Sequence, residues 1–587
     1  MTRFSLRLAP RLVLFAALAA AGSFVAASQT PPASNPQLAS RQLKDRVEAL
    51  LQQMTLEEKI GQLVQYSAGY ATGPGASNLK YDELAASGQL GSMLNVVGAE
   101  ATNHYQHLAV EKSRLHIPIL FGLDVIHGHR TTFPVPLALA AAWSPATTAL
   151  VARQSALEAR ADGIRWAFSP MVDIARDPRW GRIIESSGED PYLGSALARA
   201  WVKGYQQDDL SRPDSVAVSV KHFAAYGAAI AGRDYNATDM SELTLRQVYL
   251  EPYRAAVQAG AATMMSSFNS LNGIPATANP FILNKILRGE WGFDGFVVSD
   301  WGAVSELVNH SIGDGPTVAR KALEAGVDMD MEGNLYGTVI AAQVRSGKIP
   351  VSVVDEAARR VLRVKFALGL FDHPYTTPGP AYEATPERRA LARKVADETL
   401  VLLKNDPAAG AGALLPLTAK AGKVALIGPL ADNQRELLGA WTVAGEAKYV
   451  VTLRQAFAER LGDRLLYAPG CGLLAGEDNR ILQEASFNDA GLNGSTGSKQ
   501  HTPALDDAQA IAEAVATAQK ADLVVLALGE SSAWMEGEAS SRATLGFTGA
   551  QQQLLEAVSD RQARRPGGAG RPPVGTHLGR RARPCHP

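Results

Sequence analysis

The residue best placed to do chemistry is Asp300, two residues after the apolar run Gly295–Val298 and directly before Trp301. A carboxylate at the end of a rigid strand has a fixed position, and glycosidases use such a group to attack the anomeric carbon of a sugar. The neighbouring indole offers a flat apolar surface for a sugar ring. A structural alternative is that Asp300 caps the next helix. Other polar residues nearby decide between the two interpretations.

Four more segments before Asp300 carry residues that could take part in a site, most of them polar. They contain Asp124 in Gly-Leu-Asp, Arg182 in Trp-Gly-Arg, the pair Lys221-His222, and the stretch Met264–Asn269, which includes Met265 and Phe268. Each also has a structural interpretation. In that interpretation, Lys221 and His222 are only a polar pair at a strand end, and Arg182 only pairs with Glu185 or Glu189. The recurrence of such residues along the chain favours a binding site.

The elements that position these residues alternate between short apolar runs and longer helical stretches. The clearest runs cover residues 117–123, 166–172, 216–220, 263–268, 295–298 and 326–329. This alternation predicts βαβ units, and its length of about 300 residues suits a (β/α)8 TIM-type barrel. An open doubly wound sheet is the alternative. Polar residues at the ends of nearly all the runs favour the barrel, because barrel active sites lie at the carboxyl ends of the strands.

Composition divides the chain into five predicted parts. Residues 1–27 resemble a signal peptide, with Arg3, Arg7 and Arg11 before a short apolar stretch, although a membrane anchor is the alternative. Residues 28–373 form the barrel domain and 374–386 a proline-rich linker. Residues 387–560, with apolar runs at 424–427 and 523–528, form a partial α/β sandwich domain. Export to the periplasm or outside the cell follows from the signal peptide.

The last part, residues 561–587, differs from the rest in composition. Seven Arg, five Pro and five Gly occur in these 27 residues, without hydrophobic periodicity. Such a composition is typical of out-of-frame translation of a G+C-rich gene; a basic nucleic-acid-binding tail is the alternative. We expect a disordered tail and an incomplete second domain, and therefore weak or absent activity and a tendency to aggregate.

The overall charge and the cysteine count restrict the partners. The net charge is −1 and the chain has two cysteines, so nucleic acid, an anionic membrane surface and a disulfide framework are not indicated. No cysteine or histidine spacing indicates a metal, and no Gly-rich loop indicates a nucleotide. The predicted partner is a small neutral glycoside, with no cofactor and with the oligomeric state left open.

Taken together and in order, these motifs resemble glycoside hydrolase family 3, and in particular its bacterial periplasmic β-glucosidases. The segment Ile286–Asp300 resembles the active-site signature of the family, and the resemblance runs from about residue 40 to about residue 560. It implies exo-acting, retaining hydrolysis of terminal β-D-glucosyl residues. The alternatives are a β-xylosidase or another β-exo-glycosidase of the family, and an inactive sugar-binding relic. The hexosaminidase branch is disfavoured, because no His follows in the loop after Lys221-His222-Phe223.

The resemblance also implies residue roles. Asp300 corresponds to the nucleophile, Asp124 to a carboxylate for sugar hydroxyls, and Arg182, Lys221 and His222 to donors around the ring. Trp301 corresponds to an aromatic wall, and Met265 and Phe268 to residues that line the pocket. The general acid is expected on a loop of the second domain. The segment Glu538–Arg542 favours Glu538, with Glu536 as its main rival and Glu530 in a structural role.

Overall fold

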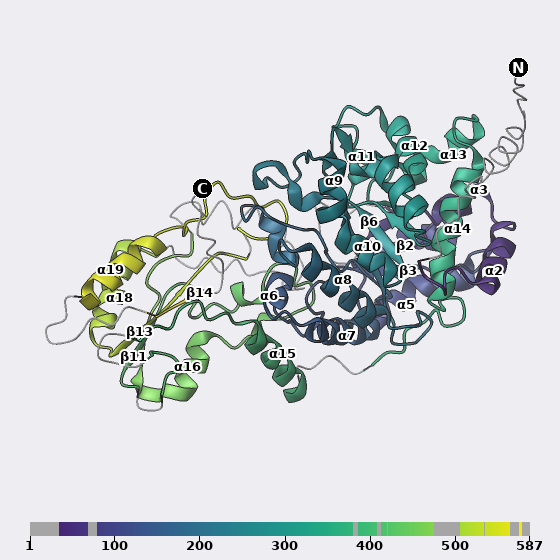
Figure 1. The fold of residues 1–587 in the computed structure, drawn as a ribbon. Helices are drawn as coiled ribbons and strands as arrows, with labels where there is room; N and C mark the ends of the chain where they lie inside the picture. The colour runs from purple at the N-terminus through teal and green to yellow at the C-terminus, as the bar shows by residue number, and fades with distance from the viewer. Residues whose placement is uncertain are drawn as a thin grey trace, which may run out of the picture.

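The computed structural model describes residues 34–68, 79–379, 385–407, 413–418, 421–474, 505–532, 535–563 and 574–577. Two bodies are visible, one containing the first two thirds of the chain and one the remainder (Figure 1). The predicted signal peptide at residues 1–27 and its cleavage site lie outside the described residues. Every helix in the described ranges is too short or too polar to cross a membrane.

The first body is built on an eight-stranded parallel sheet, in the order β10-β1-β2-β3-β4-β5-β6-β9. Its two end strands meet through a parallel bridge between Val298 and Met329, so the sheet closes on itself. This closure confirms the barrel and excludes the open doubly wound sheet. The strands are β1 Val64–Ser67, β2 Ser92–Leu94, β3 Leu120–Leu123, β4 Trp166–Ala167, β5 Ala217–Phe223, β6 Thr263–Ser266, β9 Phe296–Val298 and β10 Asp330–Met331.

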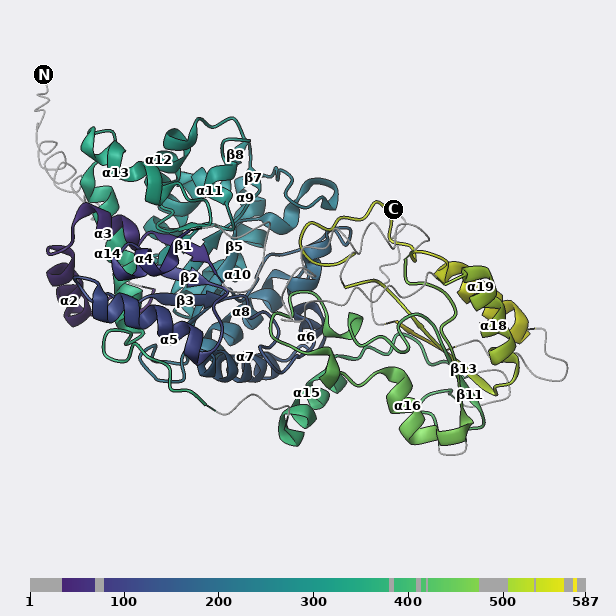
Figure 2. The ribbon, with the colours of Figure 1, turned by 180° about the vertical axis from the view of Figure 1, so that it is seen from behind.

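Helices surround this barrel on its outside, as both views show (Figures 1 and 2). The α-helices of this body are, within the described residues, α2 Arg41–Leu51, α3 Leu56–Gly61, α4 Tyr81–Ala86, α5 Ala99–His107, α6 Pro136–Ala141, α7 Pro145–Ala161, α8 Pro191–Gln206, α9 Glu242–Thr244, α10 Glu251–Gln258, α11 Ala303–Glu306, α12 Gly315–Ala325, α13 Tyr336–Arg345 and α14 Val351–Ala367. A π-helical segment, Phe281–Glu290, precedes β9, and a small hairpin joins β7 Ser270–Leu271 to β8 Ile274–Pro275.

Local sequence signals explain where several helices begin. The helix α3 begins with a capping box, in which the Thr55 side chain accepts from the Glu58 amide and the Glu58 side chain accepts from the Thr55 amide. Asp190 caps α8 and Asp314 caps α12 through their side chains, and each is followed within two residues by a proline in the first turn. The connections after β4 and β9 therefore lead into helices with well-defined starts.

The second body contains a four-stranded parallel sheet in the order β12-β11-β13-β14. Its strands are β11 Val424–Ile427, β12 Leu465–Ala468, β13 Leu523–Leu528 and β14 Val574–His577, and its helices are α16 Leu453–Leu461, α18 Asp507–Gln519 and α19 Gln551–Ala563. The helix α15 Pro386–Thr399, which precedes them, packs on α6 of the barrel and contributes Val395 to the barrel core. Separate apolar clusters cover the two faces of the sheet: Ala514 and Leu554 lie in one, and Leu430 and Phe457 in the other.

The predicted tail requires one correction. We expected no strand after Arg561, but β14 lies within residues 561–587 and pairs in parallel with β13 from Val525↔Val574 to Leu528↔His577. The four residues of β14 show no apolar alternation, and main-chain hydrogen bonds to a neighbouring strand form whatever the side chains are. The composition of the tail therefore did not reveal this strand.

Candidate active site

The predicted site residues gather at one rim of the barrel because they lie at the carboxyl ends of parallel strands. Asp124 directly follows β3, Lys221 and His222 lie near the carboxyl end of β5, and Asp300 follows β9. Arg182 lies on the 3-10 segment Gly181–Glu185, which comes after β4. The carboxyl ends of barrel strands share one rim, so residues that are far apart in sequence contact one another.

Asp124 and Lys221 form a buried ion pair. The Lys221 ammonium donates to Asp124 Oδ1 at 2.6 Å, and the two side chains are 3% and 11% exposed. A pair this buried is held rigidly, because either charge alone would be strongly destabilised. The ammonium retains further donors and the carboxylate a second oxygen, which suit the hydroxyl groups of a sugar.

His222 is neutral and has one defined tautomer. Its Nδ1 lies 3.0 Å from Asp173 Oδ2, and its Nε2 lies 2.9 Å from Nη2 of Arg182. Because a guanidinium only donates, Nε2 is the acceptor and Nδ1 carries the proton. Burial, together with the charges of Arg182 and Lys221, lowers the pKa of His222 well below its usual range. The imidazole thus orients the arginine without adding a charge.

Arg182 links several parts of the site. Its Nε and Nη2 donate to the two oxygens of Glu185 at 2.8 and 3.0 Å, which confirms the predicted pairing with that residue. Its Nη1 lies 3.3 Å from Glu538 Oε1 but has no hydrogen-bond acceptor among the described residues. The pairing with Glu185 therefore orients the guanidinium and leaves one edge directed at the site.

Asp300 has one satisfied and one unsatisfied oxygen. Its Oδ1 accepts from the amide of Trp301 at 2.7 Å, whereas buried Oδ2 has no hydrogen-bond donor in the described structure. His222 Nε2 lies 3.6 Å from Oδ2, and as an acceptor it donates no proton to it. Burial and the nearby Glu538 carboxylate raise the pKa of Asp300 to about 8. An undercoordinated carboxylate oxygen of this kind is a good nucleophile.

Glu538 reaches the rim from the second body, on a loop that docks on the barrel through main-chain contacts. The Gly181 amide donates to Ser540 O at 2.9 Å, and the Gly537 amide donates to Gly181 O at 3.0 Å. Trp180 and Ser541 form an antiparallel bridge. The predicted contribution of a second-domain carboxyl therefore agrees with the geometry of this loop.

The two rival glutamates of this loop make other contacts. Glu530 pairs with Arg542, which ties the end of β13 to the end of the loop and agrees with its predicted structural role. The Glu536 main-chain carbonyl accepts from Ser540 Oγ at 3.4 Å. Glu538, by contrast, lies beside Arg182 and Tyr235.

The predicted apolar residues differ in their placement. Met265 lies in β6, is 2% exposed and packs in the barrel core. Phe268 belongs to a separate apolar cluster with Trp180 and Tyr226, and partly buried Trp301 packs against both clusters. Phe268 and Trp301 therefore lie next to the rim, whereas the contacts of Met265 are those of a core residue.

Three aromatic residues near the site were not predicted from the sequence. The Trp441 ring of the second body lies 5.2 Å from Lys221 Nζ, and the Tyr226 ring lies 5.5 Å from the Arg182 guanidinium carbon. Tyr235 donates to Glu538 Oε1 at 2.8 Å. Tyr235 follows Asp234 in the loop Gly232–Asn236, where an acidic and an aromatic residue after a strand end were the available signal. No motif singles out Trp441.

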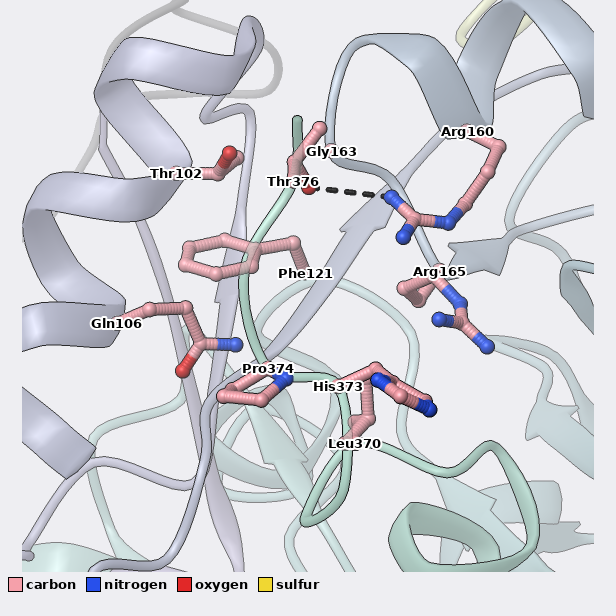
Figure 3. Close-up of a pocket in the computed structure, with 10 residues that line it drawn as sticks. All are labelled: Thr102, Gln106, Phe121, Arg160, Gly163, Arg165, Leu370, His373, Pro374 and Thr376. Atoms are coloured by element: carbon pink, nitrogen blue, oxygen red, sulfur yellow. Dashed lines mark hydrogen bonds between the residues drawn. The ribbon is translucent and has the colours of Figure 1, made fainter. Parts of the chain in front are cut away.

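Two cavities elsewhere in the barrel share no residue with this rim. The one in Figure 3 has a volume of about 10 Å³, and Arg160 on its wall donates to Thr376 Oγ1 at 3.1 Å. The other has a volume of about 220 Å³ and lies between Glu57, Tyr66 and Asn334. The first cavity holds at most a water-sized molecule, so neither its size nor its position fits a sugar ring.

Known proteins share both bodies of this structure. Residues 55–364 match the Glycosyl hydrolase family 3 N terminal domain, and residues 400–565 match the Glycosyl hydrolase family 3 C-terminal domain. A periplasmic beta-glucosidase of Salmonella typhimurium is 40% identical over 520 residues, covering 87% of this chain and 65% of that protein. A beta-xylosidase of Formosa agariphila is 32% identical over 542 residues, covering 88% of this chain and 65% of its own length.

A solved structure is similar as well. The beta-glucosidase from Listeria innocua, in complex with isofagomine, superposes with a TM-score of 0.78 at 38% identity, covering 91% of this chain and 69% of that one. This chain spans 65% of the length of both the Salmonella and the Formosa relatives. The two matched domains coincide with the barrel and with the body that carries Glu538, and on this basis the chain belongs to glycosyl hydrolase family 3.

Proposed function

We propose that this protein hydrolyses terminal, non-reducing β-D-glucosyl residues from small glycosides, with retention of configuration. One observation carries the proposal: a chain of contacts joins two carboxyl groups from different bodies. Glu538 Oε1 lies 3.3 Å from Arg182, Arg182 lies 2.9 Å from His222, and His222 lies 3.6 Å from Asp300 Oδ2. Two carboxyl groups held on either side of a bond are what glycoside hydrolysis requires.

In the first step Asp300 is the nucleophile and Glu538 the acid. Oδ2 of Asp300 forms a bond to the anomeric carbon while the bond to the leaving oxygen breaks, and Glu538 gives that oxygen its proton. The two carboxyl groups repel each other's charge, so near neutral pH the pair retains one proton. The reactive form has this proton on Glu538, with Asp300 ionised.

In the second step Glu538 acts as a base. A water molecule attacks the anomeric carbon of the glycosyl–Asp300 ester and gives a proton to Glu538, and the bond to Asp300 breaks. Two inversions at the same carbon give overall retention. Both carboxyl groups return to their initial protonation states, so no cofactor takes part in the cycle.

The ion pair of Asp124 and Lys221 binds the hydroxyl groups of the glucosyl ring in this proposal. A charged donor beside a charged acceptor suits adjacent hydroxyls, which both donate and accept. The Trp301 and Trp441 rings offer apolar surfaces for the C–H face of the sugar. Among the described residues, the cations at this rim are each paired with a carboxylate, Lys221 with Asp124 and Arg182 with Glu185, which suits a neutral glycoside.

A β-xyloside is the second candidate substrate. The 32% identity to the Formosa beta-xylosidase supports it. Glucose differs from xylose by one hydroxymethyl group, and the contacts described above do not distinguish the two sugars. The higher identity to the Salmonella enzyme, 40%, favours the glucoside. The name of that relative also supports export to the periplasm.

The decisive experiment compares aryl β-D-glucoside and aryl β-D-xyloside hydrolysis by the purified protein and by its Asp300→Asn variant. We expect the glucoside to be preferred, and a kcat in the ordinary enzyme range of roughly 1–10³ s⁻¹ would reject the weak activity expected from the composition of residues 561–587. Asp300→Asn preserves volume but removes the nucleophile, so kcat should fall at least about 10³-fold while the circular dichroism spectrum stays unchanged.

Three outcomes would reject parts of this proposal. A faster reaction with the xyloside would transfer the assignment to a β-xylosidase. A variant that keeps more than a few per cent of wild-type kcat would remove Asp300 from its role. A folded wild-type protein that binds glucose but hydrolyses neither substrate would be the sugar-binding relic.

A further inference from the structure

The barrel loop Gly232–Asn236, which belongs to none of the predicted motifs, makes several hydrogen bonds to the Glu538 loop. The Tyr235 hydroxyl donates to Glu538 Oε1 at 2.8 Å. Asp234 accepts from the Ala539 amide and from Trp180 Nε1, at 2.8 and 2.7 Å, and its own amide donates to Ser541 Oγ. Asp234 thus holds the loop at Ala539 and Ser541, and Tyr235 holds the side chain of Glu538, the proposed acid.

The backbone at Tyr235 is held in an unfavourable conformation. Its φ is 61°, in the left-handed region that non-glycine residues seldom adopt. The ring packs edge-on against Phe268 with a centroid distance of 5.2 Å, and it lies 6.4 Å from the Tyr226 ring. Because such a conformation persists only where its surroundings impose it, the direction of the Tyr235 hydroxyl is a fixed feature of the rim.

The two contacts of the Glu538 carboxyl fall on the same oxygen. Both Tyr235 and Arg182, at 3.3 Å, approach Oε1, and no hydrogen bond to Oε2 occurs among the described residues. Burial and the nearby Glu538 carboxylate raise the pKa of Tyr235, so the phenol stays protonated and donates throughout the working pH range. A carboxyl oxygen that accepts from a hydroxyl and lies 3.3 Å from a guanidinium nitrogen is the less basic of the pair, and a proton therefore binds to the other oxygen.

We propose that Tyr235 is a positioning residue for the acid and base of the reaction, which makes Oε2 of Glu538 the oxygen that exchanges the proton. This inference rests on the proposed function. In the first step the Oε2–H bond breaks as the proton moves to the leaving oxygen. In the second step Oε2 takes the proton of the attacking water. Tyr235 keeps its own proton in both steps.

The test is a Tyr235→Phe variant, assayed with two aryl β-glucosides that differ in leaving group. With phenyl β-D-glucoside, whose leaving oxygen needs a proton, we expect kcat/KM to fall roughly 10- to 100-fold. With 2,4-dinitrophenyl β-D-glucoside, which leaves without protonation, kcat/KM should change by less than about threefold. The basic limb of the pH profile for the phenyl substrate should move up by roughly half a pH unit or more, because the carboxylate form of Glu538 has lost a donor.

Tyr192→Phe is the matched control, since Tyr192 is 81% exposed and lies on the outer helix α8. It should leave both substrates and the pH profile unchanged. Equal losses on the two substrates without a pH shift would mean that Tyr235 only supports the loop, and would overturn the inference, as would a variant with normal kinetics. Asp300→Asn assayed alongside separates the two proposals: if it is inactive while Tyr235→Phe is normal, only the positioning role fails.

Discussion

At the scale of single residues, the choice of acid between Glu538 and Glu536 depends on which carboxyl group the barrel contacts. Glu538 lies within 3.3 Å of Arg182 and accepts from Tyr235. An acid must be held within reach of the leaving oxygen, so the geometry favours the carboxyl group that the rim fixes. A difference of two positions in the loop separates the candidates, and kinetics with an external nucleophile resolves it.

We expect Glu538→Ala to lose its second step selectively. A dinitrophenyl glucoside should still form the glycosyl–Asp300 ester, and azide should then speed its breakdown and raise kcat roughly 10-fold or more, yielding a β-glycosyl azide. Glu536→Ala should keep near-normal kcat and show no response to azide. Azide rescue of Glu536→Ala, with a normal Glu538→Ala enzyme, would reverse the assignment.

At the scale of elements, the site depends on the contact between the Glu538 loop and residues 179–181. Gly181 has no side chain where the loop passes: a Cβ atom there would lie 2.5 Å from both the main-chain oxygen and Cβ of Ser540. Real Cβ contacts are not that short, so any side chain at this position would push the loop outward. The close approach of two main chains thus places a second-body carboxyl on the barrel.

Gly181→Ala should therefore reduce activity without unfolding the protein. A shift of about 1 Å in a catalytic group costs roughly 10²-fold in rate, so kcat/KM for phenyl β-D-glucoside should fall by about that factor. Gly379→Ala is the control, because a Cβ at Gly379 meets no atom within 4 Å. Both variants should keep the thermal unfolding midpoint within a few degrees. Normal kinetics for Gly181→Ala would show that the loop reaches the site independently of this contact.

How much the sequence predicts differs between these elements. The runs at 424–427 and 523–528 coincide with β11 and β13, because strands buried on both faces are continuously apolar. β1 was not predicted: Gln65 interrupts its apolar pattern, yet this side chain is fully buried and donates to Ser92 Oγ at 2.8 Å. The predicted run at 326–329 ends before β10, although Met329 joins the barrel through its bridge to Val298.

The site likewise contains residues that the sequence predicts and residues that it does not. Asp124, Lys221, His222 and Asp300 lie together because each ends or closely follows a barrel strand, a rule that applies to the sequence directly, and Arg182 joins them from the 3-10 segment Gly181–Glu185 in the connection after β4. Tyr235 and Trp441 reach the rim through loop conformations with φ near 61° and through docking of the second body. Contacts between distant segments depend on tertiary packing, and one sequence carries no local signal for them.

At the scale of the whole molecule, the proposed catalytic carboxyl groups, Asp300 and Glu538, come from two bodies that have separate apolar cores. Asp300 is 8% exposed, and its Oδ2 lacks a hydrogen-bond donor in the described structure. Burying an ionisable group without a full set of partners destabilises the native state. The site therefore reduces the stability of the protein in exchange for reactivity, as active sites commonly do.

The effect of buried Asp300 on the free energy of unfolding depends on pH, because its carboxyl group has different pKa values in the folded and unfolded protein. The pKa of Asp300 is raised from its ordinary 3.8 to about 8 in the folded protein, mainly by burial and then by Glu538. The unfolded chain loses this proton from about pH 4 upward, whereas the native state keeps it to about pH 8. The contribution of Asp300 to stability is thus fully present below pH 4 and is lost as the pH rises to 8.

Asp300→Asn should therefore stabilise the protein, and more so at pH 8 than at pH 5. Asparagine does not ionise, so the variant lacks the loss of stability that wild type suffers between pH 5 and pH 8, which we expect to be on the order of 3–4 kcal/mol. Thermal unfolding midpoints of the two proteins, measured from pH 5 to pH 8, should diverge steadily. Asp45→Asn, whose side chain is 73% exposed in wild type, should run parallel to wild type. Parallel curves for Asp300→Asn as well would mean that Asp300 is ionised in the folded protein across this range.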